Sequence, residues 1–128
     1  MAAADDSVRR RRNDRRGRRA ETIAAWYLRI KGYQIVARRV RCHAGEIDII
    51  ARRGDSLVFV EVKARATLDS AIFALHPAAL RRIEAASRVL APRYGNGCTT
   101  TRIDAVLVRP WGLPVHMVAI RRERDGWS

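Results

Sequence analysis

The sequence has few cysteines and no long apolar run, and these absences exclude several classes of protein. Its two cysteines, Cys42 and Cys98, match no metal-binding spacing, and we interpret them as reduced intracellular thiols. No apolar stretch approaches the roughly 20 residues that a membrane-spanning helix needs. No apolar segment follows the basic N-terminal residues either, so we predict no secretory signal. We therefore expect a cytoplasmic protein that does not enter a membrane.

Lysine is also scarce, because only Lys31 and Lys63 occur among 26 basic residues. Against these 26 stand 13 acidic residues, which gives a formal net charge of +13. This excess is larger than solubility requires, and it indicates a polyanionic partner such as nucleic acid. Genomic base composition is a second explanation for part of the arginine excess.

The chain has 128 residues, of which 48% are hydrophobic, and this is enough for one domain with a buried core. Residues 1–18 are rich in arginine and nearly lack apolar side chains, so we predict a disordered basic tail there. This tail either contacts phosphate or is a solvated extension. A start codon placed too early would also create such an extension. We assign the folded domain to residues 19–122 and a C-terminal tail to residues 123–128.

Hydrophobic periodicity predicts two helices and five strands. The helices cover residues 19–30 and 77–90, with apolar faces made by Ala20, Ile23, Ala24, Tyr27 and Leu28 and by Ala79, Ile83, Ala86 and Leu90. Pro77 suits the first turn of the second helix, and Pro92 with Gly95 should end it. The strands cover residues 33–41, 46–52, 57–63, 103–108 and 115–120, and residues 64–70 form a mobile loop. The order α-β-β-β-α-β-β defines an α/β fold without internal repeats.

The two central strands predict an antiparallel hairpin, because the four residues from Arg53 to Ser56 between them favour a turn. Shifting the register by one residue would move Asp48 and Phe59 to opposite faces of the sheet. The register that a four-residue loop implies pairs Arg52 with Leu57, Ile50 with Phe59, Asp48 with Glu61 and Glu46 with Lys63.

Two carboxylates meet in this register. Asp48 and Glu61 would be cross-strand neighbours with Cβ atoms roughly 5 Å apart, and like charges in such a pair destabilise a sheet. A divalent cation such as Mg²⁺ removes this conflict, because it binds carboxylates, water and phosphate oxygens. Lys63 lies two residues after Glu61 on the same face, where it could stabilise a phosphoryl oxygen or orient an attacking water. The alternative is a solvated strand edge, in which Lys63 pairs with Glu46.

Glu21 borders the core-facing side of the first predicted helix, since it precedes Ala24, Ala25 and Leu28 at helical spacing. Its carboxylate could reach the hairpin as a further metal ligand, or as an acceptor behind the metal ligands. Alternatively, it is an acidic residue that the helix dipole favours near a helix N-terminus.

Several sequence blocks resemble the YraN-type family of small bacterial proteins. That family is similar to the PD-(D/E)xK nuclease superfamily, and to archaeal Holliday junction resolvases in particular. The resemblance covers nearly the whole chain from Gly17. Its blocks are Ala20-Glu21 with Tyr27-Leu28, Gly32-Tyr33, Gly45-Glu46-Ile47-Asp48, Val58-Phe59-Val60-Glu61-Val62-Lys63 with Arg65, and Arg102-Ile103-Asp104.

The resemblance implies a restriction-endonuclease-like, nuclease-type domain over residues 19–122, with a mixed central sheet flanked by helices. Carried over by position, Asp48 and Glu61 would bind Mg²⁺ or Mn²⁺, and Lys63 would be the catalytic lysine. Glu21 would be the helical acid, and thus a further catalytic and metal-binding candidate. Arg65 would lie beside the substrate phosphate.

The chain departs from the family pattern at two positions. Members commonly have a lysine near position 79, where this chain has Ala79, and Arg81 or Arg82 could supply the nucleic-acid-binding charge instead. Members commonly have phenylalanine where this chain has Ile103, which changes only packing. The resemblance also implies a homodimer, since junction-cutting enzymes of similar type work as dimers.

Three functions compete. The first is a magnesium-dependent endonuclease that hydrolyses phosphodiester bonds in DNA, including branched DNA. The second is a non-catalytic nucleic-acid-binding protein that retains the nuclease fold, and the third is a protein–protein adaptor. The intact set of Asp48, Glu61 and Lys63 favours the first function over the second. The net charge favours either of them over the third.

Other polar and aromatic residues receive structural interpretations. We expect Asp104 to pair with Arg102 in a buried arrangement. Trp26 is interpreted as a packing residue, whereas the exposure of Trp111 in its Pro-Trp-Gly turn is left open. The three histidines, which show no ligand spacing and are interpreted as loop or surface residues, are His43, His76 and His116. The C-terminal arginines, which extend the basic surface or belong to a solvated tail, are Arg121, Arg122 and Arg124.

Overall fold

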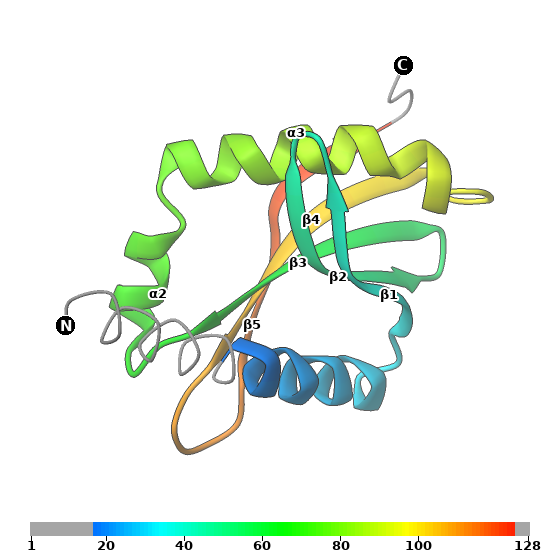
Figure 1. Cartoon of the computed structure of the whole chain (residues 1–128). Helices are drawn as coiled ribbons and strands as arrows, with labels where there is room; N and C mark the ends of the chain where they lie inside the picture. The colour runs from blue at the N-terminus through cyan, green and yellow to red at the C-terminus, as the bar shows by residue number, and fades with distance from the viewer. Residues whose placement is uncertain (1–16, 125–128) are drawn as a thin grey trace, which may run out of the picture.

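The computed structural model describes residues 17–124, and it contains one five-stranded sheet with helices packed around it (Figure 1). A helix over residues 17–30 comes first. The strands lie in the order β1-β2-β3-β4-β5; β3 and β4 are parallel, and the other neighbours are antiparallel. This mixed α/β sheet confirms the predicted fold class. The further elements are β1 (Gln34–Cys42), β2 (Gly45–Arg53), β3 (Ser56–Ala64), α2 (Leu68–Ala74), α3 (Pro77–Tyr94), β4 (Thr100–Val108) and β5 (Val115–Arg124).

The two predicted tails are covered only in part. Residues 17 and 18 already belong to the first helix, and β5 reaches Arg124. The remainder of these tails, residues 1–16 and 125–128, lies outside the described residues, and so does Trp127. Between residues 17 and 124, no helix is both long and apolar enough to cross a membrane.

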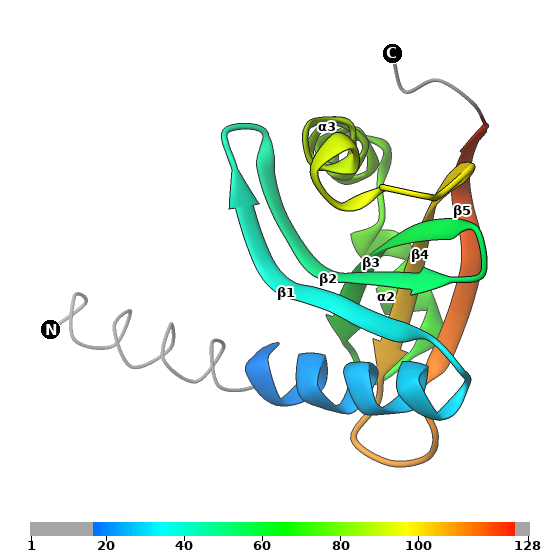
Figure 2. The same cartoon turned by 90° about the vertical axis from the view of Figure 1, so that its right-hand side faces the viewer.

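One face of the sheet is covered by the helix over residues 17–30, and the opposite face by α3 (Figure 2). Ala24 and Leu28 of the first helix are fully buried against the sheet, as predicted. Ile23 was expected in the same stripe, but it is 41% exposed, because the inward face of the helix is turned toward the fully buried Ala25. Trp26 is likewise 60% exposed, so its interpretation as a packing residue is wrong.

The first helix ends in a Schellman motif at Gly32. The Gly32 N–H donates to the Arg29 carbonyl at 3.0 Å, and the Tyr33 N–H donates to the Leu28 carbonyl at 2.9 Å. Gly32 has φ 94°, a left-handed conformation that glycine adopts without steric cost. This turn directs the chain into β1 and places Tyr33 in the core, where it is 6% exposed.

Helix α3 buries Ala79, Ile83, Ala86 and Leu90 against the other face of the sheet, as predicted. Its N-cap is His76, whose ring accepts a hydrogen bond from the Ala79 N–H at 3.3 Å. The prediction that Pro92 ends the helix is wrong. Pro92 lies within its last turn, and the helix ends at Gly95, which confirms the other half of that prediction. A proline near the end of a helix removes one hydrogen bond without breaking the preceding turns.

A short helix, α2, occupies part of the segment that was predicted as a mobile loop over residues 64–70. The hydroxyl of Thr67 caps this helix by accepting a hydrogen bond from the Ser70 N–H at 3.2 Å. Asp69 lies in the first turn, where the helix dipole favours an acidic side chain. Seven residues are too few for an apolar periodicity to indicate a helix.

The β2–β3 hairpin has the predicted register near its turn, where Arg52 pairs with Leu57 and Ile50 pairs with Phe59. The turn itself contains two residues rather than four, because Arg53 pairs with Ser56. Gly54 has φ 57°, which suits the positive-φ position of a two-residue hairpin turn.

The same hairpin corrects the prediction at its other end. The β2–β3 ladder ends at Ile49 and Val60, so the expected pairs of Asp48 with Glu61 and of Glu46 with Lys63 are not formed. From this point β2 remains paired with β1 as far as Gly45 opposite Cys42. The β1–β2 hairpin curves toward α3 (Figure 2), and Ile47 is buried in the core cluster that α3 covers. Burial of Ile47 beneath α3 therefore draws β2 away from β3.

Candidate functional site

Asp48 lies at the point where β2 leaves β3. The strands have parted here, and Asp48 Oδ2 accepts a hydrogen bond from the Val62 N–H at 2.8 Å in place of a ladder bond. Burial, followed by the negative charges of Glu61 and Glu21, raises the pKa of Asp48 to about 7, although the hydrogen bond from Val62 and the charge of Lys63 act in the opposite direction. The carboxyl is therefore about half protonated at neutral pH, which is unusual for aspartate.

Glu61 and Lys63 form an ion pair next to Asp48. The Lys63 Nζ lies 2.9 Å from Glu61 Oε1, and the two side chains are 22% and 15% exposed. The alternative prediction that Lys63 pairs with Glu46 is wrong, because Glu46 lies 3.5 Å from the exposed Arg41 instead. Asp48, Glu61 and Lys63 thus lie close enough to influence one another electrostatically, although the two acids are not ladder partners.

Glu21 of the first helix is 3% exposed, which is rare for a glutamate and requires ionic partners. Arg38 Nε lies 3.1 Å from Glu21 Oε1, and Arg39 Nε lies 2.8 Å from Glu21 Oε2. The hydrogen bond to Glu21 raises the pKa of Arg39. Glu21 is thus a buried, neutralised acid rather than an exposed acid at the helix N-terminus.

Sequence analysis missed Arg38 and Arg39, because consecutive residues of a regular strand point to opposite faces. Arg39 has φ 53°, and this left-handed conformation interrupts the alternation, so that both guanidinium groups reach Glu21. Such a conformation is costly for a residue other than glycine, by about 1–3 kcal/mol. A strained backbone next to two buried acids is typical of a functional site.

Glu21 and Asp48 line the same hollow, which has a volume of about 260 Å³ and lies between the first turn of the helix and the β1–β2 hairpin. Carboxylates and guanidinium groups alternate around it. The residues that line it are Gly17, Arg18, Glu21, Arg39, Arg41, Glu46, Asp48 and Val62. The predicted helical acid and the predicted strand acid are therefore brought to one place on the surface.

Carboxylate oxygens are the ligands that Mg²⁺ prefers, so the chemistry of this donor set fits the ion. Among residues 17–124, however, no three acidic, histidine or cysteine side chains are gathered closely enough to hold a metal as they stand. Glu21 is engaged by Arg38 and Arg39, and Glu61 by Lys63. Coordination by these glutamates would require their side chains to leave the present ion pairs.

The three predicted nucleic-acid-binding arginines are exposed. Arg65 directly follows β3, and its guanidinium donates to the Ala64 carbonyl at 2.9 Å. Arg81 and Arg82 are exposed in the first half of α3. All three are accessible to a polyanion, but only Arg65 adjoins the strand that carries Glu61 and Lys63.

A second polar cluster confirms the structural interpretation of Asp104, whose carboxylate is completely buried. Arg102 approaches it in a bidentate manner, at 2.8 Å through Nε and 2.9 Å through Nη2, and the Ala119 N–H donates to it at 2.8 Å. Burial would raise the pKa of Asp104, but hydrogen bonds from His116, Arg102 and Ala119 outweigh it and hold the pKa below its usual value.

His116 belongs to this cluster, so its interpretation as a loop or surface histidine is wrong. Its side chain is 2% exposed, and its Nε2 lies 2.7 Å from Asp104 Oδ2. On the other side of the ring, Lys31 Nζ lies 2.6 Å from Nδ1. Because a lysine ammonium only donates, Nδ1 is the acceptor, and the ring proton therefore faces Asp104. The partners of His116 are distant in sequence, so no local pattern indicates them.

The fold and this site define a class of protein: a small α/β protein with a partly buried cluster of acids, lysine and arginines where two strands of a mixed sheet separate. The chain belongs to the uncharacterised protein family UPF0102, whose model matches residues 20–108. This confirms the predicted YraN-type family, which is the same family.

Relatives with the same family name align over most of their length. A UPF0102 protein of Rhizorhabdus wittichii is 49% identical over 112 residues, which cover 88% of this chain and 95% of the relative. A UPF0102 protein of Sinorhizobium fredii is 50% identical over 118 residues, which cover 91% of this chain and 97% of the relative. A UPF0102 protein of Sinorhizobium medicae is 53% identical over 104 residues, which cover 80% of this chain and 85% of the relative. The family thus accounts for nearly the whole chain.

Proposed function

We propose that this protein is a metal-dependent endonuclease that hydrolyses phosphodiester bonds in DNA, including branched DNA. The observation that carries this proposal is the meeting of Asp48, Glu61 and Lys63 where β2 separates from β3, with Glu21 on the hollow that Asp48 also lines. Two neighbouring half-buried carboxylates destabilise a fold, and a bound cation offsets that cost.

In this proposal, Asp48 and Glu61 bind Mg²⁺ or Mn²⁺, and Glu21 acts as a further ligand or as an acceptor behind them. Water and substrate phosphate complete the coordination that such ions take in proteins. When bound, the ion lowers the pKa of a water molecule and offsets negative charge on the phosphate.

The chain's own groups supply the rest of the chemistry. Lys63 carries a proton 2.9 Å from Glu61, and its positive charge stabilises the negative charge that develops on a phosphoryl oxygen. Arg65, Arg81 and Arg82 hold the DNA backbone without reading its sequence, consistent with a net charge of +13. The resemblance to junction-cutting enzymes adds a homodimer to the proposal, which sedimentation velocity of the full chain would test.

The test is cleavage of labelled junction, flap, duplex and single-stranded DNA in Mg²⁺ or Mn²⁺. We expect cleavage by the wild type and its loss in Asp48→Asn and Glu61→Gln, with DNA binding retained. Asp69→Asn is the matched control, because Asp69 is an exposed acid of α2, and it should cleave like the wild type. Equal cleavage by all four proteins would reveal a contaminating nuclease and contradict the proposal.

A second candidate is a non-catalytic nucleic-acid-binding protein with the same fold. It is favoured by the ion pairs that already neutralise Glu21 and Glu61 without a metal. This candidate predicts salt-sensitive DNA binding with no cleavage on any substrate, and no effect of Mn²⁺ on the melting temperature. Thermal stabilisation by Mn²⁺ that disappears in Asp48→Asn would contradict it.

A further inference from the structure

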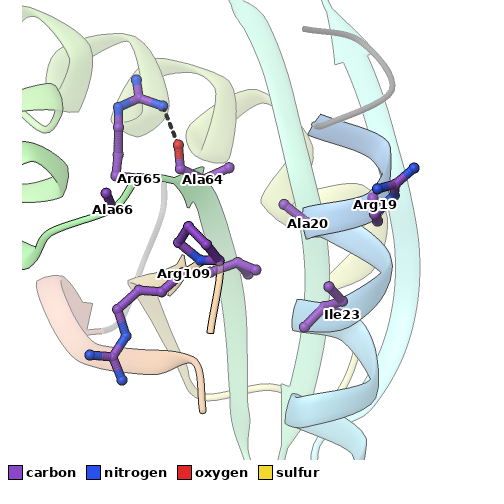
Figure 3. A pocket seen from close by; sticks show the side chains of 9 residues that line it. Arg19, Ala20, Ile23, Ala64, Arg65, Ala66 and Arg109 are labelled. Atoms are coloured by element: carbon purple, nitrogen blue, oxygen red, sulfur yellow. Dashed lines mark hydrogen bonds between the residues drawn. The ribbon is translucent and has the colours of Figure 1, made fainter. Parts of the chain in front are cut away.

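A second, larger pocket lies beside the candidate site and plays no part in the chemistry above. It has a volume of about 490 Å³, within the range of small-molecule sites, and it lies where the parallel strands β3 and β4 end (Figure 3). Ligands commonly bind at the carboxyl ends of parallel strands. The pocket is lined by Arg19, Ala20, Ile23, Ala64, Arg65, Ala66, Val108, Arg109 and Pro110.

The lining combines an apolar floor with positive charge. Ala20 and Val108 belong to the buried core, and none of the lining residues is acidic. Arg65 and Arg109 donate to the carbonyls of Ala64 and Leu113, and no ion pair among the described residues engages them or Arg19. Three uncompensated guanidinium groups around an apolar floor fit a ligand with an anionic part and a flat apolar part.

Two tryptophans are close in sequence to residues that line this pocket. Trp111 directly follows Pro110 and is 82% exposed, and Trp26 lies one helical turn after Ile23 and is 60% exposed. Exposed aromatic rings next to arginines are the usual surface for unstacked bases, because every base has a face that can stack.

The pocket and the hollow of the candidate site share the same two elements. On the first helix, Glu21 lines the hollow and Ala20 lines the pocket; on β3, Val62 lines the hollow and Ala64 lines the pocket. Two residues along a strand span roughly 7 Å, so the two cavities are about one nucleotide apart. A DNA strand that crosses the hollow of the candidate site therefore also passes the pocket.

We infer that this pocket binds one unpaired nucleotide next to the site of cleavage, with its phosphate on the arginines and its base on the apolar floor and Trp111. A base within a duplex is stacked and paired and does not enter a concave pocket, whereas an unpaired base does. The position of this nucleotide relative to a cleaved bond rests on the proposed function. The binding of the nucleotide to the pocket does not depend on that function.

The test is metal-free binding of the full chain in EDTA, measured by fluorescence anisotropy with three labelled DNA probes. These are a blunt duplex, the same duplex with a short single-stranded overhang, and that overhang with abasic nucleotides. We expect the overhang to tighten binding about tenfold, and the abasic overhang to lose most of that gain. Equal affinity for the blunt and overhanging duplexes would overturn the inference.

Substitutions then show which part of the protein causes the preference for the overhang. Ala66→Trp fills the pocket from an exposed loop position and should abolish the preference for the overhang. Thr99→Trp is the matched control, because Thr99 is exposed at the opposite end of β4, and it should keep the preference. Trp111→Ala should reduce the preference and the quenching of tryptophan fluorescence by DNA. A preference that survives Ala66→Trp would place the nucleotide elsewhere and contradict the inference.

The two proposals fail separately. A preference for the overhang in a wild-type protein that cleaves none of the DNA substrates supports the pocket and refutes the nuclease. Cleavage without any preference for unpaired nucleotides supports the nuclease and refutes the pocket.

Discussion

At the scale of single residues, Asp48 has the least ordinary environment in the described chain. Its pKa of about 7 results first from burial and then from the charges of Glu61 and Glu21. The unfolded chain has the usual aspartate pKa near 4. Between these two values the folded state binds more protons than the unfolded state, so stability falls as pH rises through this range. Ionised Asp48 therefore costs the fold roughly a few kcal/mol above pH 7.

Asp48→Asn should stabilise the protein at pH 8, because asparagine retains an oxygen for the Val62 N–H and carries no charge. The gain should shrink as the pH falls toward 4 and vanish below it, where Asp48 is protonated in both states. Urea denaturation at pH 5 and pH 8 measures this gain in the free energy of unfolding, and Asp55→Asn in the exposed turn is the control. The same destabilisation at both pH values would show that the charge of Asp48 imposes no cost.

A metal ion should bind only the ionised form of Asp48. We therefore expect Mn²⁺ to raise the melting temperature more at pH 8 than at pH 6, by about 5 °C at ten times its Kd. Differential scanning fluorimetry in a manganese titration measures this shift. Neither Asp48→Asn nor Glu61→Gln should respond, whereas Asp69→Asn should respond like the wild type. A shift of equal size in Asp48→Asn would place the ion elsewhere.

At the scale of elements, the buried Asp104 connects three segments. It binds Arg102 of its own strand, and His116 and Ala119 of β5, and His116 in turn binds Lys31 just after the first helix. The end of that helix is thereby fixed to the edge of the sheet. Because the pKa of Asp104 is lowered, its contribution to stability is present above pH 4 and is lost as pH falls below that value.

Asp104→Ala should cost about 3–5 kcal/mol in the free energy of unfolding, because it leaves the largely buried Arg102 without a carboxylate partner. Glu84→Ala, which breaks the more exposed ion pair with Arg121 at 2.9 Å, should cost less than about 1 kcal/mol. Urea denaturation at pH 7 compares the two variants. Similar losses in the free energy of unfolding would mean that burial adds nothing to the contribution of the Asp104 ion pair to stability.

Local sequence patterns predicted those elements whose residues interact with near neighbours. Alternation fixed the hairpin around Ile50 and Phe59, and helical spacing identified the inward face of α3. The separation of β2 from β3 at Asp48 was not predictable, since it depends on Ile47 packing beneath a helix that lies some 30 residues later. The candidate acids and Lys63 were found because they lie within two neighbouring strands.

The arginine partners of Glu21 escaped prediction for a different reason. A positive φ at a residue other than glycine leaves no signal in composition or periodicity. Arg39 has such a φ of 53° and therefore shares a face with Arg38. The same holds for Ala119, whose φ of 55° lets its N–H reach Asp104.

At the scale of the whole molecule, charge decides how the protein should meet DNA. With a net charge of +13, affinity for duplex DNA should fall steeply with salt, by roughly 10³ or more between 50 and 200 mM if six or more phosphates are contacted. Anisotropy titrations across this range measure the slope. Arg65→Gln should lower the slope by about one, whereas Arg53→Gln, at the far end of β2, should not. A flat salt response would exclude phosphate contacts.

The separation of β2 from β3 has one mechanical consequence. Asp48 moves with the β1–β2 hairpin, which rests on α3, whereas Glu61 moves with the body of the sheet. The separation of the two carboxylates therefore depends on how closely α3 packs on the hairpin, near Gly45, where an added Cβ atom would lie 3.9 Å from the Ala86 Cβ.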